Sequence, residues 1–329
     1  MPYQRRSYSS RARRPTYRTA RPARYTRNSY SRRPTSRRTP IRRTYRRRST
    51  EKMPRYRRSY RRRRPMTRKK ILNLTSVKKQ DNMQLSSNVT AATPQGSATY
   101  TNSAAVLPAT QLYIFPWIAT ARDLDRDTGN IRGAPSDSAT RTAQTCYMVG
   151  LRENIEITTN DGLPWQWRRI CFTFKGSEFT ATSTTGLNYY LQTSNGMTRT
   201  VNTAYGSTAV GVLQSLLFKG AAGVDWSNTI TAPTDNTTIS VKYDRTISIA
   251  SGNEQGTIRR YRRFHPMGHN IIYADDEQGG TESESFVSSR GKPGMGDYYV
   301  IDIFQPRFGG TSASQLRFEP SATLYWHEK

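Results

Sequence analysis

Almost all of the net charge of this chain lies in its first 70 residues. They contain 26 Arg, 3 Lys and one acidic residue, Glu51, which gives a net charge of +28. The other 259 residues contain 23 Lys and Arg against 22 Asp and Glu, a net charge of +1. Such asymmetry is typical of a tail that binds nucleic acid or an acidic membrane surface. The sequence therefore predicts two regions, residues 1–70 and residues 71–329.

The basic region lacks the residues that a folded core requires. It has one Ile and no Leu, Val, Phe, Trp or Gly. Little apolar area is available to offset the roughly 1–2 kcal/mol per residue that backbone ordering costs. We therefore expect residues 1–70 to form a disordered, Arg-rich N-terminal arm.

The composition of the arm indicates a polyanionic partner. Guanidinium groups pair with phosphate oxygens bidentately and stack on bases better than ammonium groups do. Eight Tyr are spaced among the Arg, and a base stacked on an aromatic ring gains about 1–3 kcal/mol. This mixture favours flexible single strands, so we expect the arm to bind a single-stranded nucleic acid. The predicted nucleic-acid contacts of the arm are Arg42, Arg43, Arg46, Arg47, Arg48, Arg57, Arg58, Arg61, Arg62, Arg63 and Arg64.

The end of the arm also has the composition of a nuclear import signal, which an import receptor would bind. The residues predicted for this role are Arg61, Arg62, Arg63, Arg64, Arg68, Lys69 and Lys70. A simple solvated tail is the alternative interpretation. A basic membrane anchor would need an apolar helix face, and no apolar run reaches the roughly 18 residues of a membrane span, so we expect no membrane partner.

Residues 71–329 show an apolar period of two, which indicates β-strands. In 149–159, for example, Val149, Leu151, Ile155 and Ile157 are predicted to share one face. Strands are predicted in 69–79, 111–120, 149–159, 165–176, 237–251, 297–304 and 315–329, and a short helix in 209–220. Seven or eight strands with long connections predict an all-β fold, a single eight-stranded jelly-roll sandwich, ahead of other β-sandwiches.

The sequence offers few groups for catalysis or metal binding. Asp123, Asp125 and Asp127 have the spacing of a calcium loop, but Gly129 comes one position late and Ala134 stands where the final Glu would be. Cys146 and Cys171 have no metal-ligand spacing and are expected to be buried thiols, and Pro266 and Gly268 disfavour a helix that could present His265 and His269 to one ion. We therefore expect no enzymatic activity, no metal and no cofactor.

Two basic clusters lie outside the arm. Arg259, Arg260, Arg262 and Arg263 surround Tyr261, and Arg168 and Arg169 lie beside Trp165 and Trp167. In an extended chain Arg260 and Arg262 share a face with Phe264, and Arg259 and Arg263 share the other with Tyr261. These arginines are candidate DNA contacts of the body. Ion pairing with acidic residues of the same or another subunit is the alternative, and the sequence leaves both open.

Two long stretches carry a resemblance to a known family. "GLPWQWRRICFTFKG" (162–176) and "DRTISIASGNEQGTIRRYRRFHPMGHNIIYADDEQGG" (244–280) resemble the capsid proteins of genomoviruses, the gemycircularvirus-like single-stranded DNA viruses. The second stretch resembles, more distantly, the coat proteins of geminiviruses. The resemblance extends over essentially the whole chain, although the part in the arm is only compositional.

The resemblance implies a jelly-roll capsid subunit. About 60 copies would assemble into a small icosahedral shell around a circular single-stranded DNA genome, in the virion and in the host cell nucleus. Sixty arms would carry roughly 1,700 positive charges, enough to neutralise a genome on the order of 2 kilobases. The alternative is a host nucleic-acid-binding protein of ribosomal or chromatin type, for which the 259-residue body is large.

Overall fold

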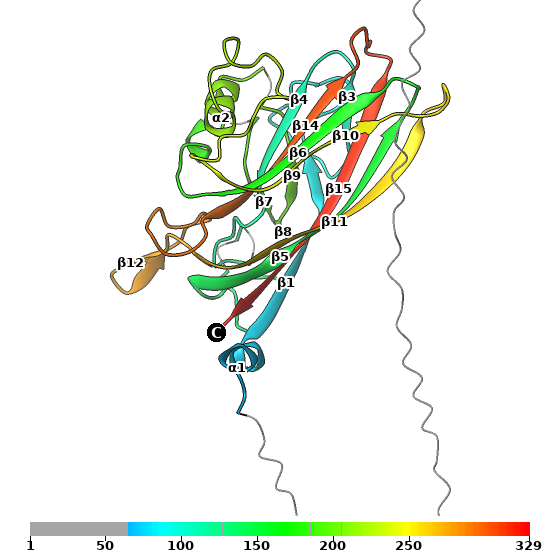
Figure 1. Cartoon of the computed structure of the whole chain (residues 1–329). Helices are drawn as coiled ribbons and strands as arrows, with labels where there is room; N and C mark the ends of the chain where they lie inside the picture. The colour runs from blue at the N-terminus through cyan, green and yellow to red at the C-terminus, as the bar shows by residue number, and fades with distance from the viewer. Residues whose placement is uncertain (1–64, 127, 130, 185, 205) are drawn as a thin grey trace, which may run out of the picture. The chain divides into compact units, whose positions relative to one another are not determined.

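The computed structural model describes residues 65–329 except 127, 130, 185 and 205. The eleven arm arginines named above, and Asp127, lie outside the described residues. In the described part, nine strands form two antiparallel sheets (Figure 1). The first sheet has the order β1 (Val77–Met83), β15 (Gln315–Glu328), β5 (Thr145–Thr159) and β11 (Thr257–Ile272), and β3 (Ala105–Pro108) also pairs with β15. The second has the order β10 (Ser240–Ile249), β6 (Trp165–Phe174), β14 (Asp297–Pro306) and β4 (Tyr113–Ile118).

The two sheets pack on each other through apolar and aromatic side chains. Trp167 and Phe304 of the second sheet stack with ring centroids 5.8 Å apart. Phe304 also meets Phe318 of the first sheet at 4.9 Å, and all three are buried. This contact joins the two sheets into a sandwich, so the all-β prediction is confirmed.

The second sheet is buried on its outer face as well. The segment 175–239 lies over this face and contains η1 (Thr180–Thr182), β7 (Gln192–Thr193), β8 (Gly196–Met197), β9 (Arg199–Val201) and α2 (Ala209–Leu217). Leu213 and Leu217 of α2 belong to the same buried cluster as Ile170 and Ile301 of the sheet. Burial on both faces explains the nearly continuous apolar run of β14. The helix predicted in 209–220 is confirmed by α2.

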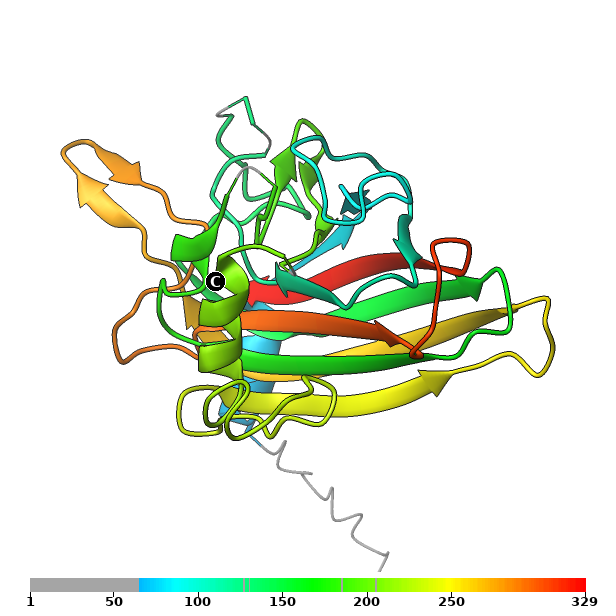
Figure 2. The same cartoon turned by 90° about the horizontal axis from the view of Figure 1, so that it is seen from above.

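The short and the long connections lie at opposite ends of the sandwich (Figures 1 and 2). The turns after β5, β10 and β14 are short, covering 160–164, 250–256 and 307–314. The long segments 121–142 and 273–296 lie at the other end, where β12 (Asp276–Gln278) and β13 (Thr281–Ser283) form a protruding hairpin. A further short strand, β2 (Leu85–Ser87), pairs in parallel with β9. In the described part of the chain, neither helix has the length and apolar character that crossing a bilayer requires.

The strand predicted for residues 69–79 is wrong over most of its length. Residues Arg68–Thr75 form a helix, α1, and the strand β1 begins only at Val77. Thr67 caps the helix by accepting a hydrogen bond from the Lys70 N–H at 3.4 Å, and Arg, Lys and Leu favour helix when no sheet neighbour competes. The region boundary predicted after residue 70 therefore falls inside a helix.

The predicted face of Val149 is also wrong. Met148 and Leu151 are both fully buried, so the alternation shifts by one residue between them. Val149 is the extra residue, because the pairing with β11 and β15 passes from Met148 directly to Gly150. Gly150 allows this bulge: a Cβ there would lie 2.7 Å from the His265 carbonyl oxygen.

Candidate nucleic-acid face and the charged groups of the sandwich

The outer face of the first sheet is the large sheet surface that no other described segment covers. In β5, Leu151, Glu153 and Ile155 are buried, so Arg152 and Asn154 between them point outward. The pairing register places the outward residues of the neighbouring strands beside them. The charged and aromatic members of this outer face are Lys78, Tyr147, Arg152, Glu156, Arg260, Arg262, Phe264, Arg317, Glu319, Tyr325 and His327.

Positive charge predominates on the outer face. Arg260 pairs with Glu156 at 2.6 Å and Arg317 with Glu319 at 2.7 Å, both as exposed ion pairs. Three other cations, namely Lys78, Arg152 and Arg262, are exposed and have no ion pair among the described residues. These three can therefore pair with an external anion.

Aromatic rings lie between these cations. Phe264 is 55% exposed and stands opposite Arg152 in the pairing of β11 with β5. The rings of Tyr147 and His327 are 6.0 Å apart. Burial lowers the pKa of His327, and the charge of Lys78 lowers it further. His327 is thus an uncharged ring at neutral pH that can stack on a base.

A shallow depression on this face brings the two kinds of group together. Its lining includes Lys78, Phe264, Tyr325 and His327. Aromatic rings beside cations are the arrangement with which proteins bind single strands, because the rings stack on bases and the cations meet phosphates. The helix α1, which carries Arg68, Lys69 and Lys70 in exposed positions, leads directly into β1 at the edge of this sheet.

Within the basic cluster of β11, the predicted alternation is confirmed. Arg260 and Arg262 lie on the outer face with Phe264, while Tyr261 packs against the core and Arg263 is half-buried on the same side. Arg259 is exposed and donates a hydrogen bond to the Ala250 carbonyl at 2.9 Å. Whether these arginines contact DNA stays a prediction.

Arg169 cannot be the DNA contact that the sequence predicted, because it is buried inside the sandwich. It is 2% exposed, donates to Asp302 at 2.7 and 2.9 Å, and pairs with Glu153 of the opposite sheet. Arg199 of β9 pairs with the same two carboxylates, at 3.0 Å to Glu153 and 2.8 Å to Asp302. The Trp167 indole N–H donates to Asp302 at 2.8 Å. The alternative interpretation, ion pairing within the chain, holds for Arg169.

Arg168 is corrected in the same way. Its guanidinium donates two hydrogen bonds to Asp244, at 2.9 and 2.7 Å. It also donates to the carbonyls of Thr229 and Ala232, each at 2.7 Å. Four acceptors and an exposure of 5% leave no room for a phosphate, so Arg168 anchors the segment that covers the second sheet.

The pKa shifts in the interior follow from burial and from these pairs. Burial alone would raise the pKa of Asp302, but the charges of Arg169 and Arg199 hold it below its usual range. Burial lowers the pKa of His265 to about 4, with a further contribution from Arg169. Burial also raises the pKa of both thiols, Cys146 and Cys171. Both are free and buried, as predicted, and protonated thiols of this kind are weak nucleophiles.

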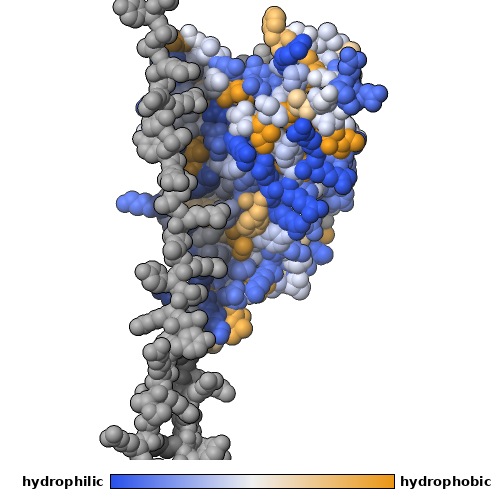
Figure 3. Space-filling view, turned by 45° about the vertical axis from the view of Figure 1, so that its right-hand side comes forward, coloured by the Kyte–Doolittle hydropathy of each residue, from blue (hydrophilic) through white to orange (hydrophobic). Residues whose placement is uncertain are grey.

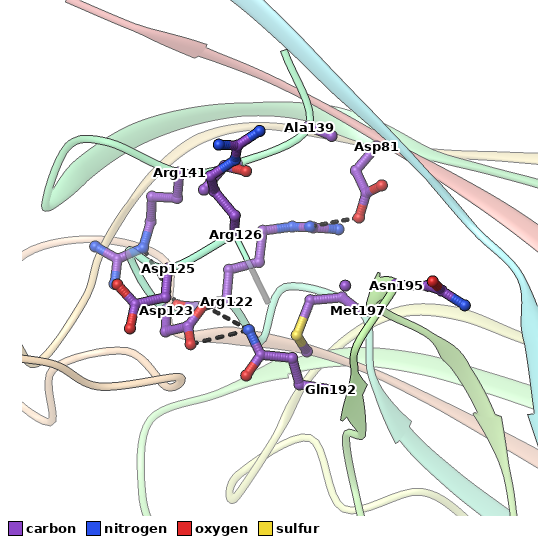
Figure 4. Close-up of a pocket in the computed structure, with 12 residues that line it drawn as sticks. Asp81, Arg122, Asp123, Asp125, Arg126, Ala139, Arg141, Gln192, Asn195 and Met197 are labelled. Carbon is purple, nitrogen blue, oxygen red and sulfur yellow. Dashed lines mark hydrogen bonds and ion pairs between the residues drawn. The ribbon is translucent and has the colours of Figure 1, made fainter. Parts of the chain in front are cut away.

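A second polar region lies among the long loops (Figure 4). There, Asp123 accepts two hydrogen bonds from the Gln192 amide, at 3.0 and 3.1 Å. The carboxylates of Asp123, Asp125 and Glu284 lie within 4.8 Å of one another. The Arg132 guanidinium pairs with the Glu284 carboxylate and lies 3.9 Å from the Asp125 carboxylate. Arg132 therefore neutralises part of the negative charge of this cluster.

The surface view in Figure 3 shows mostly hydrophilic residues, with hydrophobic residues in small groups among them. Sequence reasoning named Arg260, Arg262 and Phe264 but missed Lys78, Arg152 and the rings of Tyr147, Tyr325 and His327. Alternation could have found Arg152, which lies between Leu151 and Glu153. The network of Glu153, Arg199 and Asp302 had no sequence signal, because its members come from strands that are distant in the chain. No protein-family model matches the chain, and no curated protein matches it.

Proposed function

We propose that this chain is a viral capsid subunit that assembles into a small icosahedral shell and packages single-stranded DNA. The observation that carries the proposal is that an arm of net charge +28 is joined to a folded body of net charge +1. In this body, strands that follow one another in the chain mostly lie in different sheets. The arm supplies the charge that a packaged genome needs. The nearly neutral body lets many copies come together without mutual repulsion.

The strand order supports a jelly roll as the finer description of the sandwich. Apart from the short β3, which lies in the same sheet as β1, the strands pass back and forth between the two sheets along the chain, and β6 to β10 is the one step that stays within a sheet. The result is β1-β15-β5-β11 facing β10-β6-β14-β4. Chains that wrap in this way form jelly rolls, an architecture shared by viral capsid proteins, lectins and cupins. The arm and the resemblance favour the capsid among these.

The outer face of the first sheet supports a DNA-facing surface in the body. Its unpaired cations, Lys78, Arg152 and Arg262, and the exposed ring of Phe264 fit a flexible single strand. The arm joins the body through α1 at the edge of this same sheet. Arm and outer face are thus proposed to bind one genome together. Nuclear import through the end of the arm belongs to the same proposal.

Particle mass tests the proposal. The subunit has a mass of 37.5 kDa, so a shell of about 60 copies has a protein mass of about 2 MDa. We expect purified full-length protein mixed with single-stranded DNA to give such a particle in light scattering after size exclusion. Protein that binds the DNA but stays small at every salt concentration would instead support a host nucleic-acid-binding protein.

A further inference from the structure

One side of the sandwich is open between the edge strands β10 and β11. The inward-facing side chains along this side lie in successive levels, and each level contains one inward-facing residue of each edge strand. Tyr243 of β10 packs edge to face on His265 of β11, with centroids 5.1 Å apart. Two levels further along, Tyr261 of β11 packs in the same way on Trp167 of β6, the strand beside β10, also at 5.1 Å. A single level separates these two aromatic contacts.

That intermediate level holds two arginines. Arg245 stands opposite Arg169 in the pairing of β10 with β6, and Arg263 stands opposite Glu153 in the pairing of β11 with β5. Arg169 and Glu153 contact each other across the sandwich. Arg245 and Arg263 therefore lie at the same level on the two facing edges, and we call this pair the arginine seam.

Among the described residues of its own subunit, the arginine seam has no counter-charge. Behind it, the two arginines and the two carboxylates of the buried network cancel one another. His265, whose pKa is about 4, is neutral at physiological pH. Neither Arg245 nor Arg263 has an ion pair among the described residues, and the Arg263 Nε and the Tyr261 hydroxyl are buried without a hydrogen-bond partner there. Buried polar groups are normally satisfied, so the seam lacks an acceptor.

The hairpin of β12 and β13 has exposed carboxylates that lack cationic partners among the described residues. Residues 274–289 contain no Lys or Arg. Asp276, Glu277 and Glu282 are exposed and have no ion pair among the residues that the structure describes. The hairpin protrudes from the body (Figures 1 and 2). A two-stranded hairpin without further packing is marginally stable in water, and its open edges favour contact with another chain.

We propose that the acidic hairpin of one copy docks on the arginine seam of a second copy. The carboxylates of Asp276 and Glu277 would supply the acceptors that Arg245 and Arg263 lack. Because the hairpin and the seam are different surfaces, the contact is head-to-tail, the kind that builds closed rings and shells when the rotation closes. The inference rests on the self-assembly part of the proposed function and adds which surfaces meet.

A DNA phosphate is the other anion that could enter the seam. The alternation of β11 favours a subunit contact. Arg262 and Phe264 point to the outer face, whereas Arg263 points into the gap between the edges. One strand can therefore present one set of side chains to DNA and the other set to a neighbouring subunit.

Charge reversal in the full-length protein tests the contact. The variants D276K/E277K and R245E/R263E place like charges together, and each is expected to lower the assembled fraction at least about tenfold. Combining all four substitutions restores complementarity, and we expect assembly to return. The matched control combines R245E/R263E with E178K/E254K, at two exposed carboxylates elsewhere. It has the same net charge, +29, but is expected to stay unassembled.

The docking contact is overturned if D276K/E277K assembles like the unmodified protein, or if the control combination assembles as well as the complementary one. Loss of DNA retention in R245E/R263E with assembly intact would assign the seam to phosphate and also overturn it. If the unmodified protein forms no shells, the proposed function fails. The contact is then still decided by mixing E277C protein with R245C protein under mild oxidation. A disulfide between the two variants supports it, and its absence contradicts it.

Cross-linking also covers the case in which R263E fails to fold. The native thiols, Cys146 and Cys171, are buried, so the introduced cysteines are the accessible ones. The matched control pairs E277C with a cysteine at Lys219, an exposed position on another surface. This pair is expected to give at least about tenfold less linked product.

Discussion

Glu153, Arg169, Arg199 and Asp302 form a closed set of buried charges between the two sheets. Each carboxylate accepts from both arginines, and the four groups are at most 2% exposed. Such a set adds little net stability compared with apolar residues of similar size, but removing one member leaves a buried charge uncompensated. We therefore expect the network to fix how the two sheets are placed on each other.

Replacing Arg199 by Met should lower the free energy of unfolding by about 3–5 kcal/mol, because Glu153 and Asp302 then share one arginine. Urea unfolding followed by tryptophan fluorescence measures this. Arg260→Met is the matched control: it also breaks an Arg–Glu pair, but Arg260 is 80% exposed, and such surface pairs contribute about 0–1 kcal/mol. Similar small losses in both variants would contradict the role of the network.

His265 should make the fold sensitive to acid. Its folded pKa, about 4, lies below the value near 6.5 of an unfolded histidine, so the unfolded chain binds the proton more tightly. Stability contributed by the neutral ring is therefore present above pH 6.5 and is lost as the pH falls toward 4. Between pH 7 and 4.5 the loss is about 2 kcal/mol.

The variant His265→Phe removes this titration, and its unfolding free energy should fall by about 2 kcal/mol less than that of the unmodified protein over the same interval. Asp297, whose pKa burial raises to about 6, changes stability in the opposite direction. It is present in both proteins and cancels in the comparison. Parallel pH profiles for the two proteins would show that His265 is not the responsible group.

At the scale of the elements, alternation in the sequence predicted most of the strands but not what covers them. The strand in 149–159 and the helix in 209–220 could be recognised from their apolar periods, and the strand in 297–304 from its run of apolar residues. The helix in 68–75 could not be recognised in this way, because it depends on the Thr67 cap and on the absence of a neighbouring strand. Arg168 seemed available for DNA because a period cannot reveal that segment 175–239 covers the second sheet. Arg169 seemed available because a period cannot reveal that its partners, Glu153 of the opposite sheet and Asp302 of β14, meet it between the two sheets.

The outer face of the first sheet makes its own contribution to DNA binding in this account. In protein lacking residues 1–63, once circular dichroism shows that it is folded, R152A/R262A should reduce the salt slope of single-stranded DNA binding by up to about 2. K219A/K242A is the matched control, because it removes the same charge from exposed lysines off this face. Equal slopes for the two double variants would remove the outer face from the DNA-binding surface.

At the scale of the whole molecule, the separation of charge is the central feature. The arm carries +28 and the body +1; under the proposed function the arm therefore supplies most of the attraction to DNA, and the body supplies the contacts between copies. Arm–DNA binding should weaken steeply with salt and show little sequence preference. Under the same proposal, contacts between bodies, such as the acidic hairpin docked on the arginine seam, decide whether bound copies close into a particle.

The measurement that tests this account most directly is negative-stain microscopy of purified full-length protein, with nuclease-protected nucleic acid extracted from the same sample. The account predicts uniform closed shells that contain protected single-stranded DNA on the order of 2 kilobases, the length that about 60 arms can neutralise. Small protein that binds DNA but never closes into shells, across salt and pH, would contradict it.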